Sequence, residues 1–115
     1  FEEGNELQRC TQALEETLAR MRQAIVCIWY PVKDIAQLRS FYNTLQRGSA
    51  PKLLRIELYV DEPSDSSRLN GSGLIICNPP WGLEDELKQL LPWLTETLQS
   101  GKGGWRLDWL IAESS

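Results

Sequence analysis

Histidine is absent from the 115-residue sequence, and cysteine and methionine are scarce, at three and one residues. Without histidine, the chain lacks the base of Ser-His-Asp and Cys-His catalysis and the commonest ligand of transition metals. The three cysteines (Cys10, Cys27 and Cys77) form no C-x-x-C pair and lack zinc-site spacing. We therefore expect no metal site. Any chemistry must use carboxylates, amides, backbone groups or aromatic rings.

The sequence also lacks a hydrophobic run of membrane-spanning length, because the apolar run at 24–32 has only nine residues. Residues 1–23 are polar and carry no signal-peptide pattern. Cys27 and Cys77 lie inside apolar runs, where a free cysteine usually behaves as a small buried hydrophobe. We expect inert core thiols, a reducing cytoplasmic compartment and no membrane partner.

An excess of basic residues is missing as well: 12 Lys and Arg stand against 16 Asp and Glu, a net charge of −4. Contacts to nucleic-acid phosphates need clustered Lys and Arg, and here they are scattered. If the protein binds RNA, its main electrostatic footprint is expected outside this chain. The length and an apolar content of 42% predict one domain at most, or a piece of one.

Hydrophobic periodicity predicts an alternation of helices and strands. Asp34 is a candidate cap for a helix that Gly48 ends, and acidic residues suit the start of a helix that Pro92 should kink. The expected elements are helices at 5–22, 35–47 and 83–98, strands at 24–30, 53–60, 74–77 and 105–111, and a polar loop at 61–73. This order predicts an α/β fold with a helix-covered sheet.

Two strands differ in their pattern. The continuous apolar run at 24–30 predicts a strand buried on both faces, as in parallel sheets, which Pro31 ends. The alternation at 53–60 predicts a half-covered strand, with Arg55, Glu57 and Tyr59 on its polar face. If 53–60 runs parallel to the first strand, then 74–77 returns antiparallel. Asn78 then lies at the sheet edge opposite to the loop 61–73.

Four segments carry a resemblance to a known family: IWYPV at 28–32, LLRIELYV at 53–60, SGLIICNPPW at 72–81 and LPWL at 91–94. In this order and spacing, they resemble the C-terminal part of the RlmJ family, bacterial adenine-N6 methyltransferases of large-subunit ribosomal RNA. The resemblance covers nearly all of the chain but less than half of a family member. It implies that 1–115 is the C-terminal portion of a class I (Rossmann-like) S-adenosylmethionine-dependent methyltransferase domain, whose N-terminal cofactor-binding half is absent.

The resemblance assigns a catalytic role to Phe1, as the aromatic member of an Asp-Pro-Pro-aromatic motif that ends the preceding strand. Members more often have Tyr there, so stacking is kept and a hydroxyl contact is lost. In such a motif, oxygen atoms accept the amino hydrogens of adenine while the ring stacks on the flipped base. Positioning and electrostatics carry such a reaction without a metal. The S-adenosylmethionine loop precedes residue 1, so the fragment is expected to be inactive alone.

A second motif of the same type is present at Asn78, Pro79, Pro80 and Trp81. Alone, it would suggest an adenine or glutamine N-methyltransferase site. The expected topology places it at the wrong edge, so we favour a structural turn in which the prolines end the strand and Trp81 packs beside the following helix.

Other candidate substrate contacts lie at the expected active edge. Tyr30 follows Trp29 at the end of a strand, and we expect Trp29 to pack in the core more readily than Tyr30. Arg68, Asn70 and Ser72 belong to the polar loop, which is long enough to be functional, although a solvated surface loop is equally compatible. Trp93, Trp105 and Trp109 are expected to pack in the core or on an edge strand.

Two classes of function remain open at the level of the sequence. The chain is either a methyltransferase fragment that acts with ribosomal RNA in the intact enzyme, or a stand-alone interaction module derived from that fold. An Asp-Pro-Pro sequence upstream of Phe1 would favour the enzyme. A strand left without its neighbour also predicts self-association through an exposed sheet edge.

Overall fold

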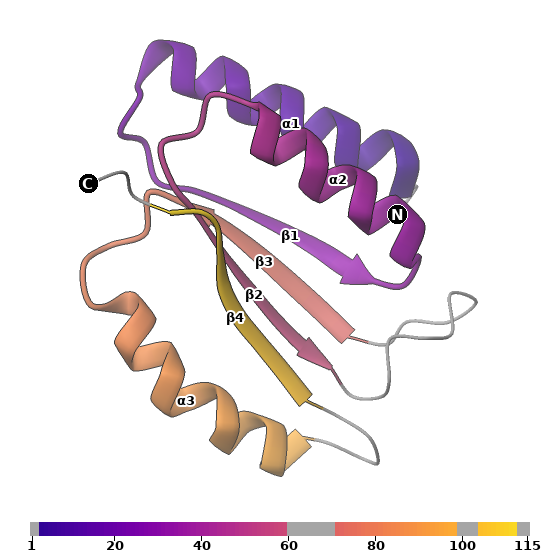
Figure 1. Ribbon diagram of the computed structural model, residues 1–115, viewed down its shortest axis with the longest axis vertical. Helices are drawn as coiled ribbons and strands as arrows, with labels where there is room; N and C mark the ends of the chain where they lie inside the picture. Colours follow the sequence, from indigo (N-terminus) through magenta and orange to yellow (C-terminus); the bar gives the residue numbers. More distant parts are fainter. Residues whose placement is uncertain (1–2, 60–70, 99–103, 113–115) are drawn as a thin grey trace.

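The structure, a computed structural model, describes residues 3–59, 71–98 and 104–112. Its helices are α1 (Glu3–Arg20), α2 (Ile35–Arg47) and α3 (Leu83–Leu98). Its strands are β1 (Val26–Val32), β2 (Leu53–Tyr59), β3 (Gly71–Cys77) and β4 (Gly104–Ile111), which form one sheet in the order β1-β3-β2-β4 (Figure 1). The predicted alternation of elements is confirmed.

Every neighbouring pair of strands in this sheet is antiparallel. Because β3 lies between β1 and β2 and opposes both, β1 and β2 run in the same direction. Their carboxyl ends, Val32 and Tyr59, therefore lie at one end of the sheet. The predicted antiparallel return of β3 is confirmed, and it places Asn78 at the other end, beside Lys52 at the start of β2.

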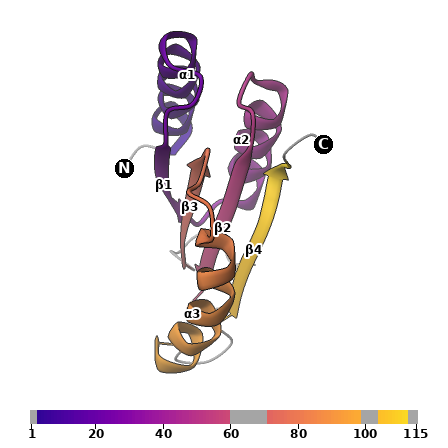
Figure 2. The same ribbon diagram turned by 90° about the vertical axis from the view of Figure 1, so that its left-hand side faces the viewer.

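Helices cover both faces of the sheet. On one face α1 and α2 pack a core that includes Leu14, Leu18, Phe41 and Tyr30. On the other face α3 covers Leu54, Ile56 and Ile76 through Leu91. Figure 1 shows α1 and α2 on the upper side of the sheet and α3 on its lower side, and in Figure 2 α3 lies at the bottom of the view, away from α1 and α2. In the described part of the chain, no helix is long and apolar enough to cross a membrane.

The local signals for the two ends of α2 and for the start of α3 are confirmed. The Asp34 carboxylate accepts hydrogen bonds from the backbone N–H groups of Ala36 and Gln37, which caps α2 as predicted. Gly48 ends this helix, and its N–H donates to the Leu45 carbonyl. Glu84, Asp85 and Glu86 occupy the first turn of α3. Pro92 lies inside α3 without ending it.

The burial of β1 and β2 reverses the expectation. Strand β1 is half exposed rather than buried on both faces, because Cys27 and Trp29 point to solvent on the α3 side of the sheet, beyond the area that α3 covers. Strand β2 is buried on both faces over Leu53–Glu57 instead of half-covered. Pro31 also lies within β1, which extends to Val32. Proline is tolerated in an edge strand, where its missing N–H leaves no ladder bond unmade.

Candidate functional site

A row of residues across the sheet builds a polar cluster near the carboxyl ends of β1 and β2. Tyr30 on β1 lies opposite Gly73 on β3, which lies opposite Glu57 on β2, and Glu57 in turn faces Arg106 on β4. A Cβ atom at Gly73 would lie 2.2 Å from the Tyr30 ring. Because Gly73 has no side chain, the Tyr30 ring can lie over β3, so its hydroxyl reaches a carboxylate two strands away.

Glu57 is the centre of this cluster and is only 2% exposed. Its Oε2 accepts a hydrogen bond of 2.6 Å from the Tyr30 hydroxyl and a second from the Tyr42 hydroxyl of α2. Its Oε1 accepts from the Tyr59 hydroxyl. We call Glu57 and these three tyrosines the tyrosine–glutamate cluster. A buried carboxylate requires such partners, because an unsatisfied one would cost several kcal/mol, on the order of 3–5.

The surroundings of the cluster keep its phenols protonated. Burial, followed by the nearby Glu57 and Tyr42, raises the pKa of Tyr30 well above its usual value. Burial and the hydrogen bonds to Glu57 likewise raise the pKa of Tyr42 and that of Tyr59. Each hydroxyl is therefore a donor to Glu57 at neutral pH, and none is suited to act as a base.

Arg55 borders the cluster on the side of β4. Its guanidinium donates to both oxygens of Asp108 on β4, at 2.8 and 2.5 Å. The same group lies over the Tyr42 ring, 4.6 Å from the centroid, which is cation–π geometry. The hydrogen bonds from Arg55 lower the pKa of Asp108, against a smaller opposing effect of burial. Strands β2 and β4 and helix α2 are thus tied together by charged and aromatic groups.

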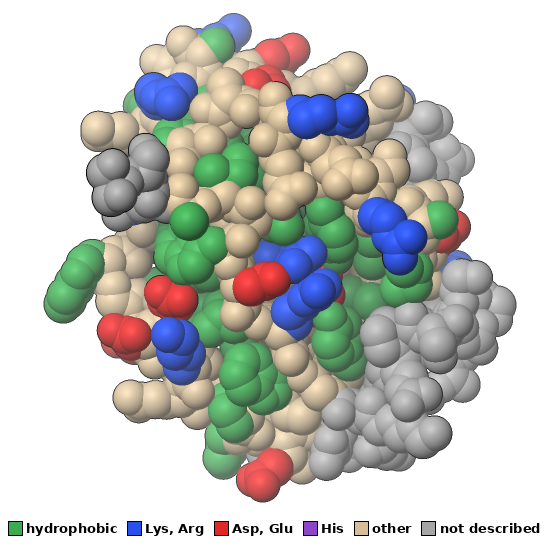
Figure 3. Space-filling model, in the orientation of Figure 1, with side chains coloured by type: hydrophobic (Ala, Val, Ile, Leu, Met, Phe, Trp, Pro, Cys, Tyr) green, Lys and Arg blue, Asp and Glu red, His purple; other side chains and the backbone are tan. Residues whose placement is uncertain are grey.

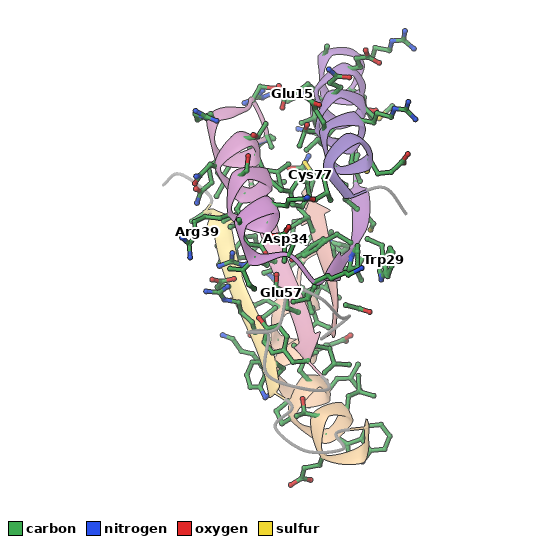
Figure 4. All side chains as sticks on the ribbon, turned by 90° about the vertical axis from the view of Figure 1, so that its right-hand side faces the viewer. Glu15, Trp29, Asp34, Arg39, Glu57 and Cys77 are labelled. Atoms are coloured by element: carbon green, nitrogen blue, oxygen red, sulfur yellow. The ribbon has the colours of Figure 1, made fainter. Side chains whose placement is uncertain are left out.

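A pocket of about 270 Å³ lies beside this cluster, at the carboxyl ends of β1 and β2. Val32, Ile35 and Leu38 form its apolar wall. Its polar lining consists of Arg39, Tyr42, Arg55, Glu57, Tyr59 and Arg106. Figure 4 shows Glu57 between α2 and the sheet, with Arg39 on the outer side of α2 and Trp29 at the far edge on β1. The lining holds three arginines and one carboxylate, so its formal charge is +2 in a chain of net charge −4.

The Asn78–Trp81 turn lies at the opposite end of the sheet. Asn78 has a positive φ of 53°, and its Nδ2 donates to the carbonyl oxygens of Arg22 and Ala24, both at 3.0 Å. The amide thus ties the end of β3 to the segment that leads into β1. Both of its N–H donors serve the fold, as the structural interpretation requires. Trp81, however, is fully exposed and does not pack beside α3 as predicted.

The remaining predicted site residues are dispersed. Phe1, Arg68 and Asn70 lie outside the described residues. Ser72 is exposed on β3, and it lies on the face that α3 occupies. Tyr30 is fully buried, and its hydroxyl is engaged by Glu57. A direct substrate contact by the Tyr30 hydroxyl would have to replace its hydrogen bond to Glu57. In the described geometry Tyr30 instead positions Glu57, which lines the neighbouring pocket.

Several aromatic and cysteine side chains differ from expectation. Trp29 is 49% exposed rather than packed in the core, and Cys27 is exposed, whereas Cys77 is buried as predicted. Trp109 packs against the α3-side core, and its Nε1 donates to Glu84. Trp93 and Trp105 are more exposed, at 60% and 40%. Among the described residues, no group of His, Cys, Asp or Glu is placed to hold a metal ion.

The pocket at the carboxyl ends does not fit S-adenosylmethionine. That cofactor carries a sulfonium cation, and the pocket presents three guanidinium groups. Its one carboxylate, Glu57, is already engaged by three hydroxyl groups. The lining of this pocket therefore offers no free carboxylate to the sulfonium and amino groups of the cofactor.

Sequence reasoning missed Glu57 and Arg55 as buried groups because it assigned them to a solvent-facing side of β2. The usable signal was the alternation in the Gly71-Ser72-Gly73 segment. Two glycines on one face of a strand leave room for large side chains from the neighbouring strands. That signal shows where space exists, but it does not identify Tyr30 and Tyr42 as the groups that fill it.

Comparison with known proteins gives a consistent result. The family model described as ribosomal RNA large subunit methyltransferase D, RlmJ, matches residues 1–111. The ribosomal RNA large subunit methyltransferases J of Haemophilus influenzae and Escherichia coli are 35% and 32% identical over 114 residues. Each alignment covers 98% of this chain and 41% of the relative, so the chain spans less than half the length of these proteins.

A solved structure agrees as well. The crystal structure of protein LPL1258 from Legionella pneumophila superposes with a TM-score of 0.82 at 26% sequence identity, covering 94% of this chain and 40% of that one. Helices on both faces of a four-stranded antiparallel sheet define a mixed α/β domain. With the match over residues 1–111, the chain belongs to the RlmJ family of ribosomal RNA methyltransferases.

Proposed function

We propose that this chain is the C-terminal part of an S-adenosylmethionine-dependent methyltransferase that modifies the exocyclic N6 of an adenine in large-subunit ribosomal RNA. The observation that carries the proposal is the family match over residues 1–111. Two relatives are ribosomal RNA large subunit methyltransferases, which supports the reaction and the substrate class. The relatives are more than twice as long as this chain, which leaves room for a cofactor-binding half elsewhere.

The geometry supports different roles for the two ends of the sheet in such an enzyme. The carboxyl ends of β1 and β2 lie together, and the polar pocket opens beside them. The Asn78 turn is remote from that end and serves the fold. In the proposal, Phe1 stacks on the target adenine, while this chain supplies the sheet and the pocket that flank the substrate. The N6 position and the cofactor are carried over from the family resemblance.

The exposed edge of β1 supports the proposal that another segment covers this strand in a longer protein. In the described sheet β1 is terminal, and Ile25 beside it is 59% exposed together with Trp29. Apolar side chains at a free strand edge are uncommon on a self-sufficient domain, because they invite pairing. A further strand and covering helix would bury them. This chain alone is therefore proposed to be inactive.

Titration calorimetry tests the proposal on the chain itself. We expect no measurable heat when S-adenosylmethionine is added to residues 1–115, and binding when the same ligand is added to a protein of the relatives' full length that carries this chain. Micromolar binding to residues 1–115 would contradict the proposed absence of a cofactor site. A folded full-length protein that fails to bind the cofactor would contradict the proposed reaction.

A further inference from the structure

We propose that the pocket beside the tyrosine–glutamate cluster binds a backbone phosphate of the RNA strand, with Arg39 and Arg106 as its ligands. This inference rests on the proposed function, since it names how that substrate is held. The pocket lies at the carboxyl ends of β1 and β2. The sequence predicts the active site at this same end of the sheet.

Charge is the first argument for an anion. Arg39 on α2, Arg55 on β2 and Arg106 on β4 all line the pocket, so three separate elements contribute an arginine to it. Figure 3 shows basic side chains gathered at the centre of the face that carries β4, with acidic side chains beside them. The net charge of the chain is −4, so this local excess of positive charge is not a property of the whole surface.

The three arginines are not equivalent. Arg55 is 8% exposed and is engaged by both oxygens of Asp108, so it forms part of the frame. Arg106 is 48% exposed, and its nearest carboxylate oxygens, on Asp108 and Glu57, are 3.8 and 3.9 Å away. These separations exceed a good hydrogen bond, which leaves the Arg106 guanidinium able to bind an additional oxygen. Arg39 is exposed on α2 and also lines the pocket.

The tyrosine–glutamate cluster explains why the pocket stays electropositive. The negative charge of Glu57 is held by three hydroxyl donors inside the protein, with 2% of the residue exposed. An incoming phosphate therefore meets the guanidinium groups and the phenol rings rather than Glu57. The other nearby carboxylate, Asp108, is bound by Arg55. Arginine suits phosphate because its planar fork donates two parallel hydrogen bonds.

Size favours a phosphate with its sugar over a larger ligand. The pocket measures about 270 Å³, just below the range of about 300–1,000 Å³ typical of small-molecule sites. A strand of RNA placed here would run beside the adenine that the proposed active site modifies. Phosphate contacts of this kind set the position of the strand and carry no sequence information themselves.

Fluorescence anisotropy with a labelled single-stranded RNA of 12 nucleotides, at about 0.1 mM chain and several salt concentrations, tests the proposal. Residues 1–115 are compared with the double variant Arg39→Gln/Arg106→Gln. The matched control is Arg9→Gln/Arg20→Gln, which removes two exposed arginines of α1 and gives the same net charge. We expect the pocket variant to bind about tenfold more weakly and to lose about 0.7 from the slope of log affinity against log salt, the contribution of one phosphate contact to a single strand. The control should keep the slope of the parent chain.

Three outcomes would overturn the proposal: no binding by the parent chain, equal weakening in both double variants, or displacement of the RNA by a polyglutamate peptide at equal charge concentration. Circular dichroism confirms folding, and Arg39→Gln alone, which should lose part of the slope that the double variant loses, replaces the double variant if that one unfolds. Because no cofactor is present, failure here leaves the proposed methyl transfer standing. Conversely, failure of methyl transfer leaves an RNA-binding pocket.

Discussion

Gly73 is the residue on which the buried polar cluster depends. The Tyr30 ring crosses β3 at this position, and its closest ring atom would lie 2.2 Å from a Cβ added there. The Tyr30 ring has little room to move, because it is fully buried and packs against the Phe41 ring at a centroid distance of 5.4 Å. Any side chain at position 73 must therefore displace the Tyr30 ring, which weakens its hydrogen bond to Glu57.

We expect Gly73→Ala to lower the free energy of unfolding by about 2–4 kcal/mol, from overpacking together with a weakened buried hydrogen bond. The matched control is Gly104→Ala, because a Cβ there would make only an ordinary contact with the Tyr59 ring at 3.8 Å. Its effect should stay within about 0.5 kcal/mol. Urea unfolding of the two variants decides between them. Equal effects would show that Tyr30 does not need the space above Gly73.

Asn78 provides a second residue-scale test, within the turn that resembles a catalytic motif. Asn78→Ala removes two hydrogen bonds to carbonyl oxygens and places alanine at a φ of 53°, so we expect a loss of about 1–2 kcal/mol. Trp81→Ala in the same turn should change stability by less than about 0.5 kcal/mol, since Trp81 is fully exposed. Thermal unfolding measures both. A larger loss for Trp81→Ala would contradict the described geometry.

At the scale of elements, helices were easier to predict than the faces of strands. Asp34 and Gly48 are local signals, and they placed both ends of α2 correctly. The faces of β1 and β2 were both predicted wrongly, because burial depends on which helix lies over a strand. Arg55 and Glu57 have the spacing of a solvated face, but α2 covers both residues. Arg55 donates hydrogen bonds to Asp108, and Glu57 accepts hydrogen bonds from Tyr30 and Tyr42.

The candidate site was predictable only in part. The sequence indicated the sheet end at which β1 and β2 terminate and the remote position of Asn78, because both follow from strand direction. The tyrosine–glutamate cluster joins Tyr30 to Glu57 across 27 residues of sequence. Pairing of this kind requires the register of three strands, which hydrophobic periodicity does not provide.

The contacts between α2 and the sheet should make stability sensitive to alkaline pH. The pKa values of Tyr30, Tyr42 and Tyr59 are raised in the folded state, chiefly by burial. Below the ordinary tyrosine pKa of about 10, their contribution to stability is fully present. Above it the unfolded chain releases protons that the folded chain retains, so stability falls as pH rises, by up to about 1.4 kcal/mol per pH unit for each group.

Urea unfolding between pH 8 and 11 should therefore show a decline that begins near pH 10, and Tyr30→Phe should make that decline shallower. At acid pH, Asp108 has the opposite effect on stability, because its pKa is lowered in the folded state. Its contribution to the free energy of unfolding is present above its ordinary pKa and is lost as pH falls through the lowered pKa. An alkaline decline of equal slope in the parent chain and in Tyr30→Phe would contradict the described burial of this phenol.

At the scale of the whole molecule, β1 is the part that a self-sufficient domain would cover. It is the terminal strand of the described sheet. Ile25 just before it and Cys27 and Trp29 within it are exposed. The chain spans 41% of the length of its curated relatives, so the remaining part of such a protein could supply that cover. Alone, the chain is expected to associate through this edge.

Sedimentation velocity over a range of concentrations tests this expectation. We expect reversible dimers or larger species for residues 1–115, and a shift towards monomer for Cys27→Lys, which places a charge on the edge strand. Ala36→Lys, at an exposed site on α2, adds the same charge elsewhere and should leave association unchanged. A clean monomer at every concentration, with a sharp two-state melt, would show that β1 needs no partner.

The most direct test of the whole account is single-turnover methylation of unmodified large-subunit ribosomal RNA by a protein of the relatives' length that carries this chain, normalised to folded protein. We predict transfer to the N6 of an adenine. Phe1→Ala should slow it about tenfold to somewhat over a hundredfold, through lost stacking of about 1–3 kcal/mol, while Phe1→Tyr is tolerated. Asn78→Ala should leave the rate per folded molecule nearly unchanged. If Asn78→Ala abolishes turnover in folded enzyme and Phe1→Ala does not, the active site lies at the other end of the sheet and the account is wrong.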